Sequence, residues 1–204
     1  MKVIIVGAGT TARSTADILS KDPNFQIYGF VGNKDEDKKL RGKYIYNNIP
    51  FVGSHEIINK LIDDEVKGFV IAIGDNYLRE KLYYFALNRG LSPINVISKN
   101  AIIMDSVNIG KGVIIKPGCI ISNNVKISDN VKLDTNVIVE VDCNIGENSS
   151  VGSGSILGGA STIGRSVELG TRVVIESYIK IGKNNKIKSG TVCFKNLKDL
   201  PRKK

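Results

Sequence analysis

The residues best suited to chemistry near the start of the chain form a glycine-rich turn. An apolar run, Lys2–Val6, leads directly into Gly7-Ala8-Gly9-Thr10-Thr11-Ala12, where a helical pattern begins. Between a strand and a helix, such a turn presents backbone N–H groups and a helix N-terminus that can hold a phosphate. The GxGxxA spacing is moderately specific on its own, and it indicates a nucleotide site. Its candidate contacts are Gly7, Gly9, Thr10 and Thr11.

The remainder of the first half predicts a small α/β domain that positions this turn. Apolar runs alternate with helical patterns, which favours a short parallel sheet whose ligands bind beyond the carboxyl ends of the strands. Asn33, Gly74 and Asn76 would join the turn residues there. Further strands are expected at Gln26–Val31, near Phe51 and at Gly68–Ile73, helices at Ala12–Lys21, His55–Asp63 and Tyr77–Arg89, and a charged loop at Gly32–Asn48.

A nicotinamide dinucleotide site is the main rival interpretation for this half. Such sites carry an acidic residue at the end of the second strand to hold a ribose, whereas Gly32-Asn33 stands there in this chain. The domain is also short for a full dinucleotide site. We therefore expect a nucleotide-linked sugar in preference to NAD.

The second half is a six-residue repeat. Sixteen hexads run from Val96 to Thr191 without an insertion, each with a branched aliphatic key residue that is often followed by glycine. A six-residue period fits neither an amphipathic helix nor an alternating strand. It predicts a β-solenoid in which each hexad forms one strand and one corner of a triangular prism. The key residues are Ile97, Ile103, Ile109, Ile115, Ile121, Ile127, Leu133, Val139, Ile145, Val151, Leu157, Ile163, Leu169, Ile175, Ile181 and Ile187.

Composition excludes several classes of protein. The three cysteines, Cys119, Cys143 and Cys193, are too few for a disulfide framework or a zinc site, so no metal and a cytoplasmic setting are expected. No apolar run approaches the ~20 residues of a membrane span, and the first residues do not resemble a signal peptide. The net charge of +9 is spread along the chain, with mild clusters at Lys38–Arg41 and Arg202–Lys204. This distribution favours nucleotides or coenzyme A over nucleic acid.

Four segments in this order, KVIIVGAGTTARSTADIL, QIYGFVGN, FVIAIGDNYLREKL and VIVEVDCNIGENSSVGSGSILGGASTIG, resemble the NeuD/PglD-like family of sugar O- and N-acyltransferases. The resemblance implies a Rossmann-like nucleotide-sugar-binding domain over residues 1–94, a left-handed parallel β-helix over 95–192 and a basic tail over 193–204. It also implies a homotrimer that binds a UDP-linked sugar against the first domain. Acetyl-CoA would lie between adjacent β-helices.

The chain lacks three histidines that the family usually carries. The family's general base falls at Val141, which is followed by Asp142, and the two other positions are Thr11 and Ser98. Without the base, an amine acceptor reacts more readily than a hydroxyl because part of it is already neutral near pH 7. The sole histidine, His55, fits a surface residue in a first helical turn.

Asp142 is the best replacement for the missing base because it follows the vacant position directly. A carboxylate is a weak base unless it is desolvated. Glu140, Asp134 and Glu176 are further candidates, and a structural or turn role is equally open for each of the four.

For the acyl donor, the resemblance implies Gly158, Gly159, Ala160 and Thr162. Arg172, Lys183 and Lys188 could meet the coenzyme A phosphates or be ordinary exposed charges. The family's C-terminal Gly, Pro and Ala-rich segment is replaced by CFKNLKDLPRKK. Two functions follow as hypotheses: an acetyl-CoA-dependent N-acyltransferase for surface glycan biosynthesis, or an inactive homologue that binds a nucleotide sugar or scaffolds a partner enzyme.

Overall fold

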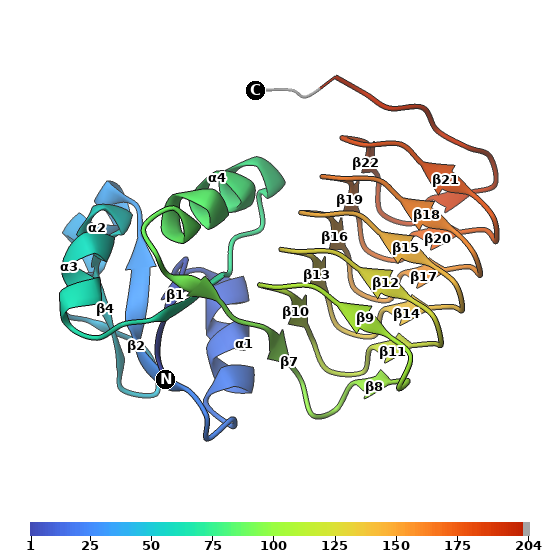
Figure 1. Ribbon diagram of the computed structural model, residues 1–204. Helices are drawn as coiled ribbons and strands as arrows, with labels where there is room; N and C mark the ends of the chain where they lie inside the picture. The colour runs from blue at the N-terminus through green and yellow to red at the C-terminus, as the bar shows by residue number, and fades with distance from the viewer. Residues whose placement is uncertain (202–204) are drawn as a thin grey trace. The chain divides into compact units, whose positions relative to one another are not determined.

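The computed structural model describes residues 1–201. The chain divides into two compact units between Val96 and Ile97. The boundary predicted from the sequence lies two residues earlier, between residues 94 and 95. Each unit has its own hydrophobic core. The first unit is an α/β domain, and the second is a stack of short parallel strands (Figure 1).

The first unit is built on one twisted sheet with the strand order β3-β4-β2-β1-β5-β6. All of its pairings are parallel except the hairpin between β3 and β4. Because β2 lies on one side of β1 and β5 on the other, the strand order reverses at β1, where such sheets bind ligands. The strands are β1 (Lys2–Val6), β2 (Gln26–Gly32), β3 (Tyr44–Tyr46), β4 (Ile49–Ser54), β5 (Gly68–Ile71) and β6 (Ser92–Pro93).

Four α-helices cover this sheet. In α1, Ala12, Ala16 and Leu19 recur at helical spacing and are at most 1% exposed, so this face packs into the core. The predicted helices and strands are confirmed, with ends that shift by a few residues. The helices are α1 (Thr10–Leu19), α2 (Lys34–Leu40), α3 (Ile58–Asp63, preceded by a 3-10 turn at His55–Ile57) and α4 (Asn76–Leu87).

The expected loop at 32–48 is wrong, because it contains α2 and β3. The Asn33 side chain accepts hydrogen bonds from the N–H groups of Asp35 and Glu36, at 2.9 and 2.8 Å. The Glu36 carboxylate in turn accepts the Asn33 N–H at 2.8 Å. This reciprocal capping box satisfies backbone donors at the start of a helix whose composition is almost entirely charged.

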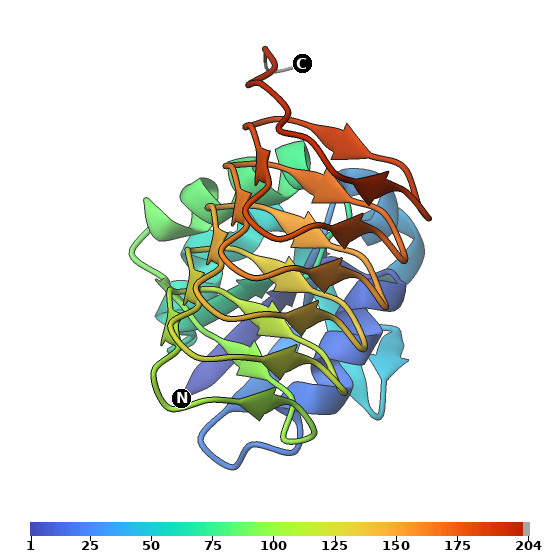
Figure 2. The same ribbon diagram turned by 90° about the vertical axis from the view of Figure 1, so that its right-hand side faces the viewer.

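The second unit confirms the solenoid. Within residues 1–201 it contains seventeen two-residue strands, one more than the sixteen hexads predict, arranged in three parallel sheets. Strands eighteen residues apart pair in register, for example Ile121 with Val139 and Val139 with Leu157. Figure 2 shows the coils one above another.

Strand positions in each sheet follow the repeat. Sheet C contains β7 (Val96–Ile97), β10 (Ile114–Ile115), β13 (Lys132–Leu133), β16 (Ser150–Val151), β19 (Glu168–Leu169) and β22 (Lys186–Ile187). Sheet D contains β8 (Ile102–Ile103), β11 (Ile120–Ile121), β14 (Ile138–Val139), β17 (Ile156–Leu157), β20 (Val174–Ile175) and β23 (Val192–Cys193). Sheet E contains β9 (Asn108–Ile109), β12 (Lys126–Ile127), β15 (Asn144–Ile145), β18 (Thr162–Ile163) and β21 (Lys180–Ile181).

Close stacking of the coils explains the glycine that often follows a key residue. A Cβ added at Gly164 would lie 2.7 Å from the Lys183 nitrogen in the next coil, and one at Gly158 would lie 2.6 Å from the Ser177 nitrogen. The small corner residues point inward. Cys119 is among them and is fully buried, and burial raises the pKa of its thiol.

From Gly112 to Gly190, each corner of the prism turns through a residue in the left-handed conformation. Asn, Asp and Gly enter this region at low cost, which explains their eighteen-residue recurrence. Asn130 donates to Asn148 at 2.9 Å, and Asn148 donates to Ser166 at 3.1 Å, so one corner carries a side-chain ladder. The corner between sheets D and E turns at Asn124, Asp142, Ala160 and Tyr178.

The segment expected to be a basic tail from residue 193 instead continues the solenoid. Cys193 lies in β23 and is 8% exposed. Leu197 forms a bridge with Ile181, and its N–H donates to the Lys180 carbonyl at 2.9 Å. The basic cluster at residues 202–204 lies outside the described residues.

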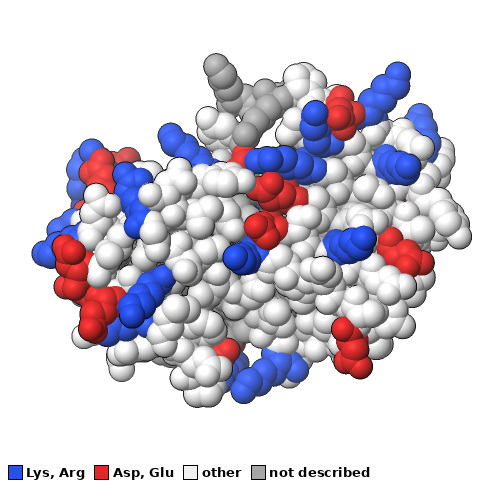
Figure 3. Space-filling model, viewed as in Figure 1, with Lys and Arg blue, Asp and Glu red and all other residues white. Residues whose placement is uncertain are grey.

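Basic and acidic side chains are mixed on the surface. Figure 3 shows Lys and Arg as separate groups among Asp and Glu on the face in view, without a continuous basic patch there. In the described part of the chain, no helix combines the length and apolarity that a membrane crossing needs.

Candidate functional site

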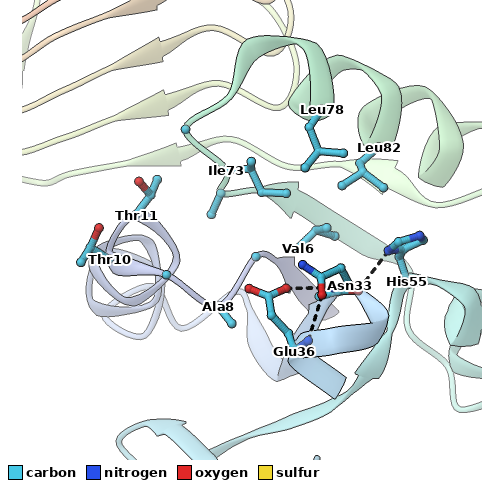
Figure 4. Close-up of a pocket in the computed structure, with 15 residues that line it drawn as sticks. Val6, Ala8, Thr10, Thr11, Asn33, Glu36, His55, Ile73, Leu78 and Leu82 are labelled. Atoms are coloured by element: carbon cyan, nitrogen blue, oxygen red, sulfur yellow. Dashed lines mark hydrogen bonds between the residues drawn. The ribbon is translucent and has the colours of Figure 1, made fainter. Parts of the chain in front are cut away.

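The N-terminal pocket is a cavity of about 370 Å³ at the carboxyl ends of β1, β2 and β5. It lies where the strand order reverses. Asn76 is not among its lining residues; this side chain is buried and accepts a hydrogen bond from Arg79 at 2.6 Å. The other six predicted contacts, Gly7, Gly9, Thr10, Thr11, Asn33 and Gly74, all line it (Figure 4).

The glycine turn leaves the start of α1 open. Gly7 has φ +122°, and a Cβ there would lie 2.7 Å from the Ala72 carbonyl oxygen, so glycine permits this close approach to β5. Gly9 is the N-cap of α1, no side chain caps the helix, and its first turn contains no acidic residue. The N-terminal N–H groups and the positive end of the helix dipole therefore remain available to a phosphate.

Glu36 and His55 also line the N-terminal pocket, although neither was predicted as a binding residue. His55 is half-buried, and its ring packs edge-on against Phe85 at 5.7 Å. Its Nδ1 lies 3.0 Å from the Gly32 carbonyl, which can only accept, so Nδ1 carries the proton. His55 does begin a 3-10 turn, as expected, but its ring is half-buried against Phe85 and not free on the surface.

Gly32 and Asn33 do stand at the end of β2, as the sequence indicates, but an acidic residue reaches this end from α2. The capping box folds Glu36 back beside Asn33, directly after β2. The signal was present in the sequence as Asn-x-x-Glu following a strand, which is the pattern of a capping box.

The solenoid groove is a depression of about 540 Å³ at the corner between sheets D and E. Three successive coils contribute to it. Ser177 and Tyr178 were not predicted, although they lie eighteen residues after Gly159 and Ala160. The groove is lined by Glu140, Val141, Asp142, Gly158, Gly159, Ala160, Ser177 and Tyr178.

The structure thus brings Asp142 together with three of the predicted donor-binding residues, Gly158, Gly159 and Ala160. It does not bring the remaining three to this groove. Thr162 lies on β18, Arg172 turns the chain at another corner with φ 55°, and Lys188 is exposed after β22.

Asp142 occupies an exposed turn. Its φ is 61° and its N–H donates to the Asn123 carbonyl at 3.1 Å. Val141 beside it is 45% exposed. The groove therefore presents an apolar side chain between two carboxylates, Glu140 and Asp142, at the position where the resemblance implies a histidine.

Two other base candidates lie elsewhere. Asp134 is paired with Lys116 at 2.8 Å and with Lys132 at 3.0 Å. Burial by itself would raise the pKa of Asp134, but the two ammonium groups outweigh it and lower that pKa. Glu176 is exposed and does not line the groove.

Ser98, the third position at which the resemblance implies a histidine, is buried and accepts the Asn100 N–H at 3.2 Å. This contact is a local turn bond. Among residues 1–201, no cluster of three or more His, Cys, Asp or Glu side chains could hold a metal ion.

The fold and the two sites define a two-part protein in which an α/β domain with a pocket at its glycine turn precedes a triangular parallel β-solenoid. Residues 2–84 match the model of the PglD N-terminal domain, and residues 97–202, more than half of the chain, match that of the GMPPB C-terminal domain. No curated protein sequence matches the chain.

Solved structures match over almost the whole chain. Perosamine N-acetyltransferase from Caulobacter crescentus, solved with CoA and GDP-perosamine, is 27% identical with a TM-score of 0.90, covering 98% of this chain and 91% of that one. The acetyltransferase domain of PglB from Neisseria gonorrhoeae is 20% identical with a TM-score of 0.74, covering 92% and 96%. WeeI from Acinetobacter baumannii is 18% identical with a TM-score of 0.57, covering 98% and 94%. The last two show the fold alone.

The chain belongs to the NeuD/PglD-like family of sugar acyltransferases, with a second half that is a member of the GMPPB C-terminal domain family. The predicted fold, a small Rossmann-like domain followed by a left-handed parallel β-helix, is confirmed.

Proposed function

We propose that this protein transfers an acetyl group from acetyl-CoA to the amino group of a nucleotide-linked sugar used in surface glycan biosynthesis. The observation that carries the proposal is the solenoid groove. Residues 140–142, 158–160 and 177–178 from three coils line it, and they include five of the residues expected for chemistry and donor binding. The likeness to perosamine N-acetyltransferase over 98% of the chain supports the same activity.

The nucleotide is held in the N-terminal pocket. Phosphates would lie on the glycine turn and the uncapped start of α1. The apolar side of the pocket, which includes Val6, Ile73 and Leu82, suits the face of a planar base.

The charge of the solenoid groove favours an amine acceptor. Glu140 and Asp142 attract an ammonium group and offer oxygen acceptors to it. With Val141 in the place of a histidine, the nucleophile is the fraction of the amine that is already neutral. Asp142 can accept the proton that the amine loses after attack, and a hydroxyl acceptor would need a stronger base.

Backbone groups in the solenoid groove can stabilise the acyl carbonyl. Among residues 1–201, the N–H groups of Gly159 and Ser177 donate no hydrogen bond. A Cβ added at Gly159 would lie 3.7 Å from Val141, the nearest neighbour, so a ligand can approach the Gly159 backbone. Such donors fit the thioester oxygen as it becomes negative, and positioning of the two substrates supplies the rest of the rate.

Sheet D supports a homotrimer as the working form. Every outward residue of its six strands is β-branched and aliphatic, whereas sheet E presents only Asn, Lys and Thr. Two of the sheet D residues, Ile102 and Val192, are more than half exposed. An apolar sheet face of this length favours association. These outward residues form the aliphatic ladder of sheet D: Ile102, Ile120, Ile138, Ile156, Val174 and Val192.

Calorimetric titration tests the proposal. Acetyl-CoA and UDP- and GDP-linked amino sugars are added separately to the full chain, and thiol release is then measured with both substrates present. Binding of both, followed by stoichiometric thiol release with the amino sugar, is expected. A hydroxyl-only analogue should bind without releasing thiol.

The absence of histidine from the solenoid groove specifically favours a second candidate, an inactive homologue that binds a nucleotide sugar or scaffolds a partner enzyme. In that case the nucleotide sugar binds and acetyl-CoA at millimolar concentration does not. That result would exclude the transferase.

A further inference from the structure

Glu36 is placed like a ligand-binding residue within the N-terminal pocket. It lies in the first turn of α2, directly after β2, and β2 is the neighbour of the strand that carries the glycine turn. In open α/β sheets an acidic residue beyond the second strand stands at the ribose of a nucleotide whose phosphates lie on the glycine turn. Glu36 stands beyond the expected position in sequence, yet the turn of α2 returns its carboxylate to this pocket.

The orientation of this carboxylate is fixed. Oε2 accepts the Asn33 N–H at 2.8 Å. Among residues 1–201, the second oxygen has neither a hydrogen-bond donor nor a basic partner. Figure 4 shows that oxygen directed away from Asn33, on the side where Ala8 lies.

The two neighbouring acids behave differently. Asp35 pairs with Lys38 at 3.7 Å and Asp37 pairs with Arg41, both within α2. Neither lines the N-terminal pocket. Of the three consecutive acids, only Glu36 contributes a carboxylate to this cavity, and it is the one without a basic partner.

Gly32 makes room for this arrangement. A Cβ at this position would lie 2.3 Å from Glu36 Oε2 and 2.9 Å from the Phe51 ring. Any side chain would therefore displace the carboxylate from the end of β2. Glycine at 32, the Asn33 cap and Glu36 together hold one acceptor oxygen at the pocket wall.

An ionised carboxylate only accepts hydrogen bonds, and the ribose hydroxyls are donors that the free oxygen of Glu36 can accept from. Building on the nucleotide-sugar site proposed above, we propose that Glu36 binds the ribose hydroxyls and makes this protein selective for ribonucleoside diphosphate sugars over their 2′-deoxy counterparts. The same negative charge repels a 2′-phosphate.

The test is a titration of the full chain with two pairs of probes, UDP against 2′-deoxy-UDP and GDP against 2′-deoxy-GDP. In the tighter-binding pair, the ribonucleotide is expected to bind about tenfold or more tightly, since one charge-assisted hydrogen bond is lost without the 2′-hydroxyl. Equal affinities within that pair would overturn the proposal while leaving the nucleotide site intact.

Glu36→Gln is the matched variant. Its carbonyl oxygen can keep the Asn33 N–H, which preserves the cap, while its NH₂ group, a donor, replaces the free acceptor. The ribo-to-deoxy ratio should fall to about one, mainly through weaker ribonucleotide binding.

Asp35→Asn, which removes the same charge one residue away, should leave the ribo-to-deoxy ratio unchanged. An unchanged ratio in Glu36→Gln contradicts the proposal. If none of the four nucleotides binds the wild-type chain, the nucleotide-sugar site itself fails, which distinguishes the two failures.

Discussion

Val141 lies between Glu140 and Asp142 on an exposed corner of the solenoid, and its side chain cannot take up a proton. The proposed reaction therefore depends on how much of the acceptor amine is neutral. Below the pKa of that amine, kcat/KM should rise about tenfold with each pH unit, because the neutral fraction does so. This dependence would belong to the substrate and not to a group on the protein.

Replacing Val141→His should restore a general base. We expect kcat/KM near pH 7 to rise by about 10²-fold, the lower end of the range for such a base. The pH profile should acquire a step near the histidine pKa of about 6.5. Steady-state thiol release from pH 5.5 to 9 measures both effects.

Val141→Asn is the control for Val141→His, because it places a polar side chain at this position without a base at this pH. Equal rates in the two variants would show that position 141 is not where the amine loses its proton.

Asp134 links stability to pH. Its pKa is lowered by Lys132 and Lys116 against the opposing effect of burial. Its contribution is therefore present above the unfolded carboxyl pKa of about 3.9 and is lost as pH falls through the lower folded value. Asp134→Ala should lower the free energy of unfolding near pH 7 by about 3 kcal/mol, because it leaves two partly buried ammonium groups without their carboxylate.

Urea unfolding measured between pH 7 and pH 3 tests this expectation. The destabilisation caused by Asp134→Ala should shrink as the wild-type carboxylate becomes protonated. A destabilisation that stays constant down to pH 3 would contradict the assignment.

At the scale of elements, the solenoid was predictable because one short period determines every strand, and all sixteen key residues lie in strands. The N-terminal helices were predictable from apolar spacing, whereas α2 was not, since it contains no buried residue and depends on the Asn33–Glu36 cap. Because this cap was not predicted, the position of Glu36 in the N-terminal pocket was not predicted either. The predicted ligand contact of Asn76 was wrong because its side chain accepts a hydrogen bond from Arg79 and does not line the cavity.

Inward and outward residues of one strand should differ sharply in their contribution to stability. In β12, Ile127 is 2% exposed within the prism and Lys126 is exposed. Ile127→Ala should cost about 2–5 kcal/mol, since the stacked ladder cannot close over the cavity. Lys126→Ala should change the free energy of unfolding by less than about 0.5 kcal/mol. Chemical denaturation of both variants measures the difference, and similar costs would contradict the assigned strand faces.

At the scale of the whole molecule, the aliphatic ladder of sheet D predicts the oligomeric state. Light scattering coupled to gel filtration should give about three times the chain mass of 22.2 kDa. Ile138→Lys, in the middle of the ladder, should shift the protein to monomer, because a desolvated unpaired charge at such an interface costs several kcal/mol. Asn144→Lys adds a similar charge on sheet E and should remain trimeric. A monomeric wild type would exclude the trimer.

The strict eighteen-residue coil also limits how the gene for such a chain can change in length. Deleting one codon within the repeat would put the strands on the two sides of the deletion out of register, because their pairing depends on an eighteen-residue spacing. Removing eighteen consecutive codons between two corners would instead shorten the stack by one coil and keep each remaining ladder aligned. Tolerated differences in length within the repeat should therefore come in whole coils or as loops at the corners, while the α/β half can vary residue by residue.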